Sequence, residues 1–80
     1  MQQNDMESSR LILGSPIDYN ELVVYIWIDE VKVCLVHQEE GKDNLKIKFN
    51  EYLTEKEIDF ALFSRALQGA KEILLDKPLT

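Results

Sequence analysis

The side chains with the most reactive chemistry in this chain of 80 residues are its single cysteine and single histidine, Cys34 and His37. A cysteine nucleophile needs a base within hydrogen-bond reach of its thiol. Both residues belong to a strand-like segment, and side chains three apart in a strand point to opposite faces. We therefore expect no cysteine–histidine catalytic pair, and we interpret His37 as a structural residue at the end of the apolar face of its strand.

The loop after this segment contains donor atoms of the kind that metals and phosphates require. His37, Glu39 and Asp43 could surround a metal ion, but a histidine at a sheet edge and a solvated loop explain them equally well. Gly41-Lys42 lacks the upstream glycine and the following Ser or Thr of a phosphate-binding loop. The sequence thus predicts no metal, no cofactor, no small-molecule substrate and no enzymatic activity.

Aromatic and basic side chains form a second group of candidates. Tyr25 and Trp27 alternate with aliphatic residues, and Lys46 and Lys48 alternate with Ile47. Aromatic residues among aliphatic ones are typical of protein interfaces, where Trp and Tyr contribute much of the binding energy. Rings with lysines on the same face are also typical of domains that bind single-stranded nucleic acid, because bases stack on rings and lysines contact phosphates.

Length and composition are those of one small folded unit. Hydrophobic residues make up 45% and charged residues 30% of the chain, which is a globular balance. We expect a flexible N-terminal segment over residues 1–9 and a single α+β domain over residues 10–80. The start of the chain lacks the pattern of a secretory signal, and the longest apolar run is too short to span a bilayer. We therefore expect a cytoplasmic protein with no membrane contact.

The chain is acidic, with a net charge of -6. This charge repels nucleic acid, so binding of nucleic acid would need a local basic patch. Many acidic residues are concentrated in one part of the chain, and they are Glu39, Glu40, Asp43, Glu51, Glu55, Glu57 and Asp59. Such a group is typical of a solvated face. Alternatively, it is a surface that mimics nucleic acid or directs the protein to a basic partner.

Residues 21–49 contain the main strand signals. Two β-branched and aromatic segments are separated by Asp29 and Glu30, and "LKIKF" follows at 45–49. A two-residue turn would pair Ile28 with Val31, Ile26 with Val33, Val24 with Leu35 and Leu22 with His37. A three-residue turn would instead place Lys32 and Cys34 on the core face. Residues 10–13 could add a fourth strand, whose place in the sheet the sequence does not show.

The remaining residues predict one helix that begins near Thr54 and ends before Pro78. Thr54 and Glu57 have the spacing of a capping box, and Asp59 is a competing start. The apolar face of this helix is formed by Ile58, Leu62, Phe63, Ala66, Leu67, Ala70, Ile73 and Leu74. We place Gly69 on the polar side, where either it is tolerated or another group approaches closely, and we favour the first. The fold class is therefore α+β, a three- or four-stranded antiparallel meander with one C-terminal helix packed on one face.

One helix cannot cover both faces of such a sheet, so the second face should be exposed. We predict that it binds a partner through Val23, Tyr25, Trp27, Lys32, Val36, Lys46 and Lys48. Trp27 and Lys32 would lie opposite each other and make a cation–π contact. Alternatively, residues 10–13 or 16–19 fold over this face and make it a second small core.

Two functions fit these features. The first is a non-enzymatic protein–protein interaction module, whether homodimer, adaptor or small inhibitor, whose partner is another protein or a second copy of the chain. The second is a single-stranded nucleic-acid-binding domain, in which Tyr25 and Trp27 stack on bases while Lys32, Lys46 and Lys48 contact phosphates. The net charge opposes the second function, so we favour the first.

Overall fold

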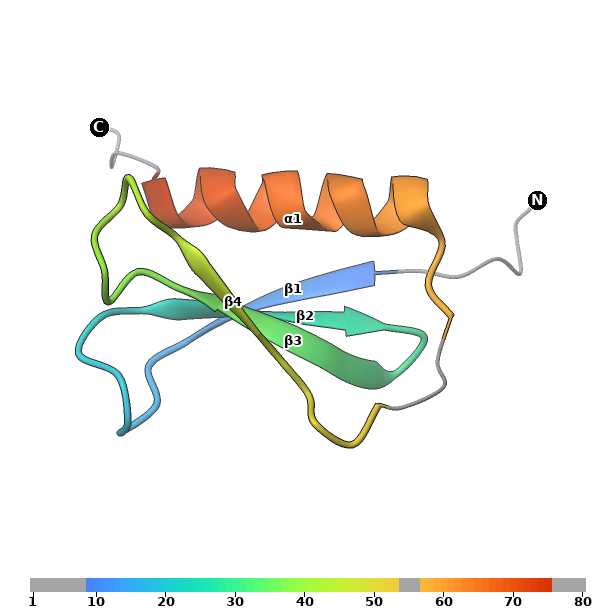
Figure 1. The fold of residues 1–80 in the computed structure, drawn as a ribbon, viewed down its shortest axis with the longest axis horizontal. Helices are drawn as coiled ribbons and strands as arrows, with labels where there is room; N and C mark the ends of the chain where they lie inside the picture. The colour runs from blue at the N-terminus through green and yellow to red at the C-terminus, as the bar shows by residue number, and fades with distance from the viewer. Residues whose placement is uncertain (1–8, 54–56, 76–80) are drawn as a thin grey trace.

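A computed structural model describes residues 9–53 and 57–75 of the chain and shows one four-stranded antiparallel sheet with one helix (Figure 1). The strands follow one another in the sheet in chain order, β1-β2-β3-β4. This arrangement confirms the predicted α+β meander, with residues 10–13 as part of its first strand. The elements are β1 (Ser9–Gly14), β2 (Val23–Ile28), β3 (Val31–His37), β4 (Lys46–Phe49) and α1 (Phe60–Leu75).

The helix α1 lies along one face of the sheet, across β1, β2 and β3, and the core lies between the two layers (Figure 1). The buried core residues are aliphatic or small, and they are Val24, Ile26, Ile28, Val33, Cys34, Val36, Ala66, Ala70 and Leu74. The predicted flexible segment at residues 1–9 lies outside the described residues, except that Ser9 begins β1.

A two-residue turn joins β2 and β3, as predicted. Asp29 and Glu30 have φ angles of 52° and 69°, so both adopt the left-handed conformation of a type I′ turn. This turn twists in the same sense as the two strands, which explains its use even without glycine or asparagine. Ile28 pairs with Val31 beside it, as the sequence predicted.

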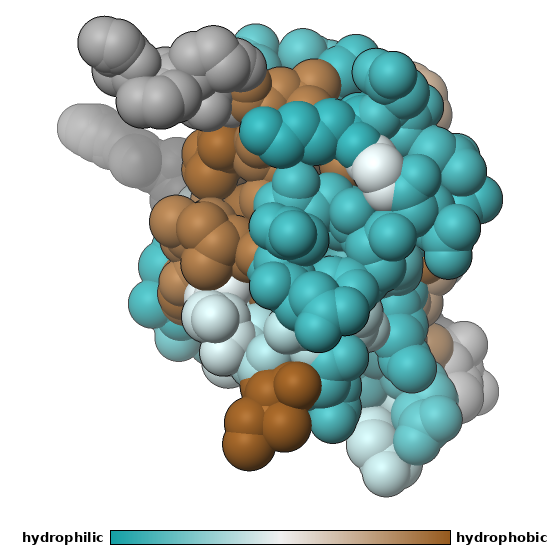
Figure 2. All heavy atoms as spheres, turned by 90° about the vertical axis from the view of Figure 1, so that its left-hand side faces the viewer, coloured by the Kyte–Doolittle hydropathy of each residue, from teal (hydrophilic) through white to brown (hydrophobic). Residues whose placement is uncertain are grey.

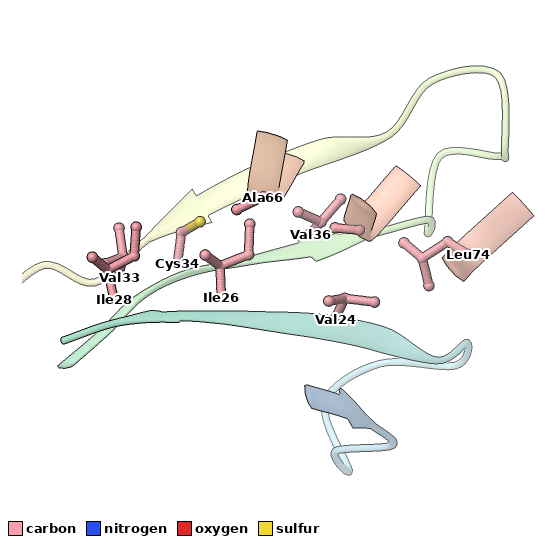
Figure 3. Packing of buried hydrophobic residues seen from close by; sticks show 9 residues of the cluster. Val24, Ile26, Ile28, Val33, Cys34, Val36, Ala66 and Leu74 are labelled. Atoms are coloured by element: carbon pink, nitrogen blue, oxygen red, sulfur yellow. The ribbon is translucent and has the colours of Figure 1, made fainter. Parts of the chain in front are cut away.

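A β-bulge follows, and it changes the predicted register of β3. Trp27 pairs with Lys32 and Ile26 pairs with Cys34, so Val33 is an additional residue in β3. In a bulge of this kind two consecutive side chains face the same side of the sheet. Val33 and Cys34 are therefore both buried against the helix side, with 1% and 2% of their surfaces exposed (Figure 3).

The bulge overturns the predicted faces for the rest of β3. Val36 points into the core and pairs with Val24, whereas it was expected on the partner-binding face. Leu35 pairs with Tyr25 on the other face instead of Val24. His37 lies on the same side of β3 as Leu35, so its predicted place on the aliphatic face is also wrong. The predicted pair between Leu22 and His37 is not formed, because the bulge shifts the register by one residue, and the Leu22 carbonyl instead accepts a hydrogen bond from Gln38 Nε2 at 3.0 Å.

The helix begins later than the capping box predicted. The Asp59 carboxylate accepts a hydrogen bond from the Leu62 N–H at 2.9 Å, and the Asp59 carbonyl accepts one from the Phe63 N–H at 3.0 Å. Asp59 is therefore the N-cap, which satisfies an amide that the first turn leaves unpaired. Thr54 lies outside the described residues, and Glu57 precedes the helix.

Gly69 lies on the sheet side of the helix and not on its polar side. A Cβ atom at this position would lie 2.8 Å from Leu11 Cδ1 of β1. Gly69 therefore faces the end of the Leu11 side chain, and its predicted place on the polar side of the helix is wrong.

Candidate interaction surface

The face of the sheet opposite α1 is called the open face here, and it carries most of the predicted binding residues. Side chains alternate along a strand, so the neighbours of the core residues point to this side. It is formed by Arg10, Ile12, Tyr25, Trp27, Lys32, Leu35, His37, Lys46 and Lys48. Of the described residues, only loop residues and strands border this face, because α1 is on the other side (Figure 1).

Both aromatic rings of the open face lie beneath a cation. The Lys32 Nζ is 5.0 Å from the centre of the Tyr25 ring, and the Arg10 Cζ is 5.4 Å from the centre of the Trp27 ring. Lys32 pairs with Trp27 in the sheet, as expected, but its ammonium group lies over Tyr25 and not over Trp27. The cations are attracted to the negative ring faces and their aliphatic stems cover the rings. Both rings are consequently half-buried.

The Tyr25 ring also lies against β1. A Cβ atom at Gly14 would be 2.6 Å from the ring carbon Cε2 of Tyr25, closer than such atoms approach each other. Only glycine leaves room for the ring at this point, because it has no side chain. Gly14 therefore determines where Tyr25 lies on the open face.

The loop between β1 and β2 closes one end of the open face. The rings of Tyr19 and His37 are in contact, with 5.1 Å between their centres. One carboxylate oxygen of Glu39 accepts hydrogen bonds from the backbone N–H groups of Asn20 and Glu21, both at 2.9 Å. Val23, at the start of β2, is fully buried. The alternative that residues 16–19 fold over this face is thus correct at this end only.

These contacts assign structural roles to two residues that had been considered for chemistry. The His37 Nδ1 accepts a hydrogen bond from the Glu39 N–H at 3.3 Å, so this nitrogen is engaged in the loop. The Glu39 side chain binds the neighbouring loop and does not belong to a purely solvated acidic face. Glu40 and Asp43 in the same segment remain exposed. Figure 2, which views the end of the molecule where these loops lie, shows a mainly hydrophilic surface with an apolar area along one side.

Cys34 faces the helix and is almost completely buried. Burial raises the pKa of its thiol to about 11, because the interior disfavours the charged thiolate. A protonated thiol is a poor nucleophile at neutral pH. Within residues 9–53 and 57–75, no three His, Cys, Asp or Glu side chains come together as metal ligands.

The other end of the open face contains a shallow concavity of about 370 Å³. It is bordered by Lys32, Leu35 and Lys48 and by the turn that follows β4. Asn50 begins this turn and holds the bulge: its Nδ2 donates to the Lys32 carbonyl at 2.8 Å and its N–H donates to the Val33 carbonyl at 2.9 Å. Its Oδ1 accepts from the Tyr52 N–H at 2.9 Å. Asn50 thus connects the bulge to the concavity.

Five of the seven predicted binding residues lie together on the open face, and the other two are buried. Those on the open face are Tyr25, Trp27, Lys32, Lys46 and Lys48. Val23 is fully buried and Val36 belongs to the core, with 0% and 3% of their surfaces exposed, so neither is available to a partner. Arg10 and Leu35 also lie on the open face, although they were not among the predicted binding residues. The alternation of Arg10 and Ile12 with leucines contained a signal for Arg10, but it did not show that β1 borders β2.

Comparisons with known proteins give no further assignment. Within the part of the chain that the structure describes, no helix is both long enough and apolar enough to cross a membrane. The chain matches no protein-family model, no curated protein and no solved structure at a significant level.

Proposed function

We propose that the protein is a non-enzymatic protein–protein interaction module that binds its partner through the open face. The observation that supports this proposal is the combination of one helix with a four-stranded sheet: among residues 9–53 and 57–75, no helix or further strand covers the aromatic and aliphatic side chains of this face. Ile12 has 40% of its surface exposed, and it lies beside Tyr25 in the sheet. Contiguous apolar surface rimmed by polar groups is typical of protein interaction sites.

The charge of this face indicates the kind of partner. The net charge is -6, but the open face carries four basic side chains, and they are Arg10, Lys32, Lys46 and Lys48. Glu30 lies 3.5 Å from Arg10 in an exposed ion pair, which offsets part of this charge. A second copy of the chain would present the same cations, and like charges across an interface are unfavourable. The open face therefore favours a foreign partner with an acidic surface over a homodimer.

Binding of single-stranded nucleic acid is the second candidate, because cations and aromatic rings share one face. Base stacking needs bare ring surfaces. Here Lys32 covers Tyr25 and Arg10 covers Trp27, so a base would first have to displace a cation from each ring. The acidic net charge adds repulsion. Both facts favour a protein partner.

The effect of Trp27→Ala tests the proposal. If Trp27 is a central contact, its removal should cost about 2 kcal/mol or more of binding free energy, since tryptophans dominate interface energetics. The measurement is sedimentation of labelled wild type and variant, each alone and in cell extract, followed by affinity measurement with the captured protein. Ile73→Ala is the matched control, because Ile73 is an apolar residue of the helix with 38% of its surface exposed, and the helix lies on the other side of the sheet from the open face. A wild type that stays monomeric in extract, or a partner insensitive to Trp27, would disprove the proposal.

A titration of Trp27 fluorescence with mixed-sequence oligonucleotides separates the two candidates. We expect no binding at physiological salt. Quenching at micromolar oligonucleotide with a log–log salt slope of roughly two or more would favour nucleic acid, because each lysine–phosphate contact releases counterions.

A further inference from the structure

The outer side of β4 is one of the two edges of the sheet, and β1 forms the other. β4 pairs with β3 on one side, and no described strand pairs with it on the other. Its helix-side residues Ile47 and Phe49 are 41% and 57% exposed, although they pair with core residues of β3. The helix lies over β1, β2 and β3 and leaves them uncovered. Two apolar side chains and a strand edge are therefore accessible together.

The helix extends this apolar surface. The rings of Phe49 and Phe63 are in contact, with 6.2 Å between their centres. Phe60 lies one turn before Phe63 and is 84% exposed. A side chain placed beyond β4 on the helix side would meet Ile47, Phe49 and the aromatic residues of the helix.

The same two residues of β4 also have backbone groups to which no strand in the described part of the chain is bonded. In an antiparallel pair, the residues of one strand point their N–H and C=O groups alternately toward and away from the partner strand. The bond from the Asn50 N–H to the Val33 carbonyl sets this alternation, so Lys46 and Lys48 bond toward β3. Ile47 and Phe49 therefore direct their N–H and C=O groups outward, away from β3.

The lysines of β4 determine which strand can occupy this edge. Lys46 and Lys48 lie on the open face and are exposed. If two copies of β4 paired with each other in one antiparallel sheet, lysine would lie opposite lysine, which is destabilising. Lysines on an edge strand oppose self-pairing for this reason. Acidic residues opposite them would be favourable.

We infer that the β4 edge binds an extended segment of a partner protein in which acidic and apolar residues alternate. The segment adds a fifth strand to the sheet by hydrogen bonds to Ile47 and Phe49. Its apolar residues contact Ile47, Phe49 and Phe60 on the helix side, and its acidic residues contact Lys46 and Lys48 on the open side. The inference rests on the proposed function in one respect, namely that the ligand is a protein.

Short capped peptides of defined sequence test this inference directly. One peptide alternates Glu with Val, and its control alternates Lys with Val. We expect the Glu peptide to shift the amide resonances of Ile47 and Phe49 in two-dimensional NMR spectra and to slow the hydrogen exchange of these two amides. The Lys peptide should bind about tenfold more weakly or not at all, because its charges repel those of β4. Equal binding of both peptides, or shifts confined to other residues, would overturn the inference.

Ile47→Pro removes the outward N–H without removing a bond to β3, and proline is tolerated at such an edge position. It should weaken Glu-peptide binding about tenfold, whereas Ile47→Val, which keeps the N–H group, should bind like wild type. If the proline variant does not fold, the double variant Lys46→Glu, Lys48→Glu serves instead. It should prefer the Lys peptide, and an unchanged preference for the Glu peptide would refute the inference.

The same experiment separates this inference from the proposed function. Trp27→Ala changes the open face and leaves the β4 backbone intact, so it should bind the Glu peptide like wild type. Loss of peptide binding in Ile47→Pro with unchanged capture of the natural partner would show that the partner uses the open face alone, and it would refute the role of the edge. Sedimentation of the free protein as a dimer that Ile47→Pro dissociates would also refute it, because the edge would then bind a second copy.

Discussion

The two faces of the β2–β3 hairpin use the same backbone but exclude water differently. On the helix side, aliphatic residues such as Ile26 and Val36 are buried beneath the small residues Ala66 and Ala70. On the open side, Tyr25 and Trp27 are only half-buried, and they are covered by Lys32 and by Arg10 of β1. A second layer of structure makes a dry core, whereas long basic side chains make a cover that leaves part of each ring in contact with solvent.

This difference has an energetic consequence. Removing a fully buried group leaves a cavity that the surrounding structure fills only partly. Removing a half-buried group leaves a space that solvent can enter, so it lowers the free energy of unfolding by less. The helix side should therefore supply stability, and the open side should be free to supply binding.

Truncation on each side of the sheet should give the largest measurable contrast. Ile26→Ala should lower the free energy of unfolding by about 3 kcal/mol, because Ile26 is completely buried. Leu35→Ala removes a half-buried side chain from the open face and should cost about 1 kcal/mol. Urea unfolding monitored by circular dichroism measures both. If Ile26→Ala does not fold, Ile26→Val should still cost about 1 kcal/mol. An equal loss of unfolding free energy in Ile26→Ala and Leu35→Ala would show that the open face excludes water as well as the core does.

Gly14→Ala should have the next largest effect. The new methyl group would lie 2.6 Å from the Tyr25 ring, so the ring must move, at a cost of about 2 kcal/mol. Combining it with Tyr25→Ala in a double-mutant cycle supplies the control, since alanine at residue 25 removes the obstacle. Gly14→Ala should then cost almost nothing in the Tyr25→Ala background. A cost that persists there would locate the strain elsewhere in β1.

Asn50→Asp should have the smallest effect and tests the bulge that divides the faces. Aspartate keeps the acceptor for the Tyr52 N–H but loses the donor to the Lys32 carbonyl, which should cost about 1 kcal/mol. Asn44→Asp makes the same change of charge in an exposed loop residue and is the matched control. Hydrogen exchange at Lys32 and Cys34 should accelerate in Asn50→Asp alone. Identical exchange in both variants would mean that Asn50 does not hold the bulge.

Much of this fold could be predicted from the sequence, because β-branched segments, the Asp29-Glu30 turn and the helical periodicity are local signals. The bulge could not be predicted. Residues 33–36 are all apolar, so either face of β3 satisfies the alternation rule equally well. The choice depends on Asn50, which is distant in sequence and bonds to the carbonyls of Lys32 and Val33.

The candidate site could be predicted in part for a similar reason. Tyr25 and Trp27 precede the bulge, so their face follows from β2 alone. Val36 lies beyond the bulge and was assigned to the wrong face. The sequence did not predict that Arg10 covers Trp27. Arg10 belongs to β1, and the pairing of β1 with β2 depends on the tertiary structure and not on a local sequence pattern. Val23 was predicted to be exposed, but it is buried. The loop that closes its end of the face is held by the contacts of Glu39, and no local sequence pattern predicts these contacts.

The order of the strands also bears on how the chain folds. Each strand pairs with the strand that precedes or follows it in the chain, so every sheet contact closes a short loop. The longest connections between paired strands are residues 15–22 and 38–45, and the entropy lost on closing a loop rises only slowly with its length. Such local topology is associated with a high folding rate. Sheets that pair segments distant in the sequence fold more slowly, because they lose the entropy of closing a long loop before they gain any contact energy. Incompletely folded chains aggregate through their unpaired strand edges. Because fast folding shortens the lifetime of such chains, we expect it to limit aggregation through the open edges of this sheet.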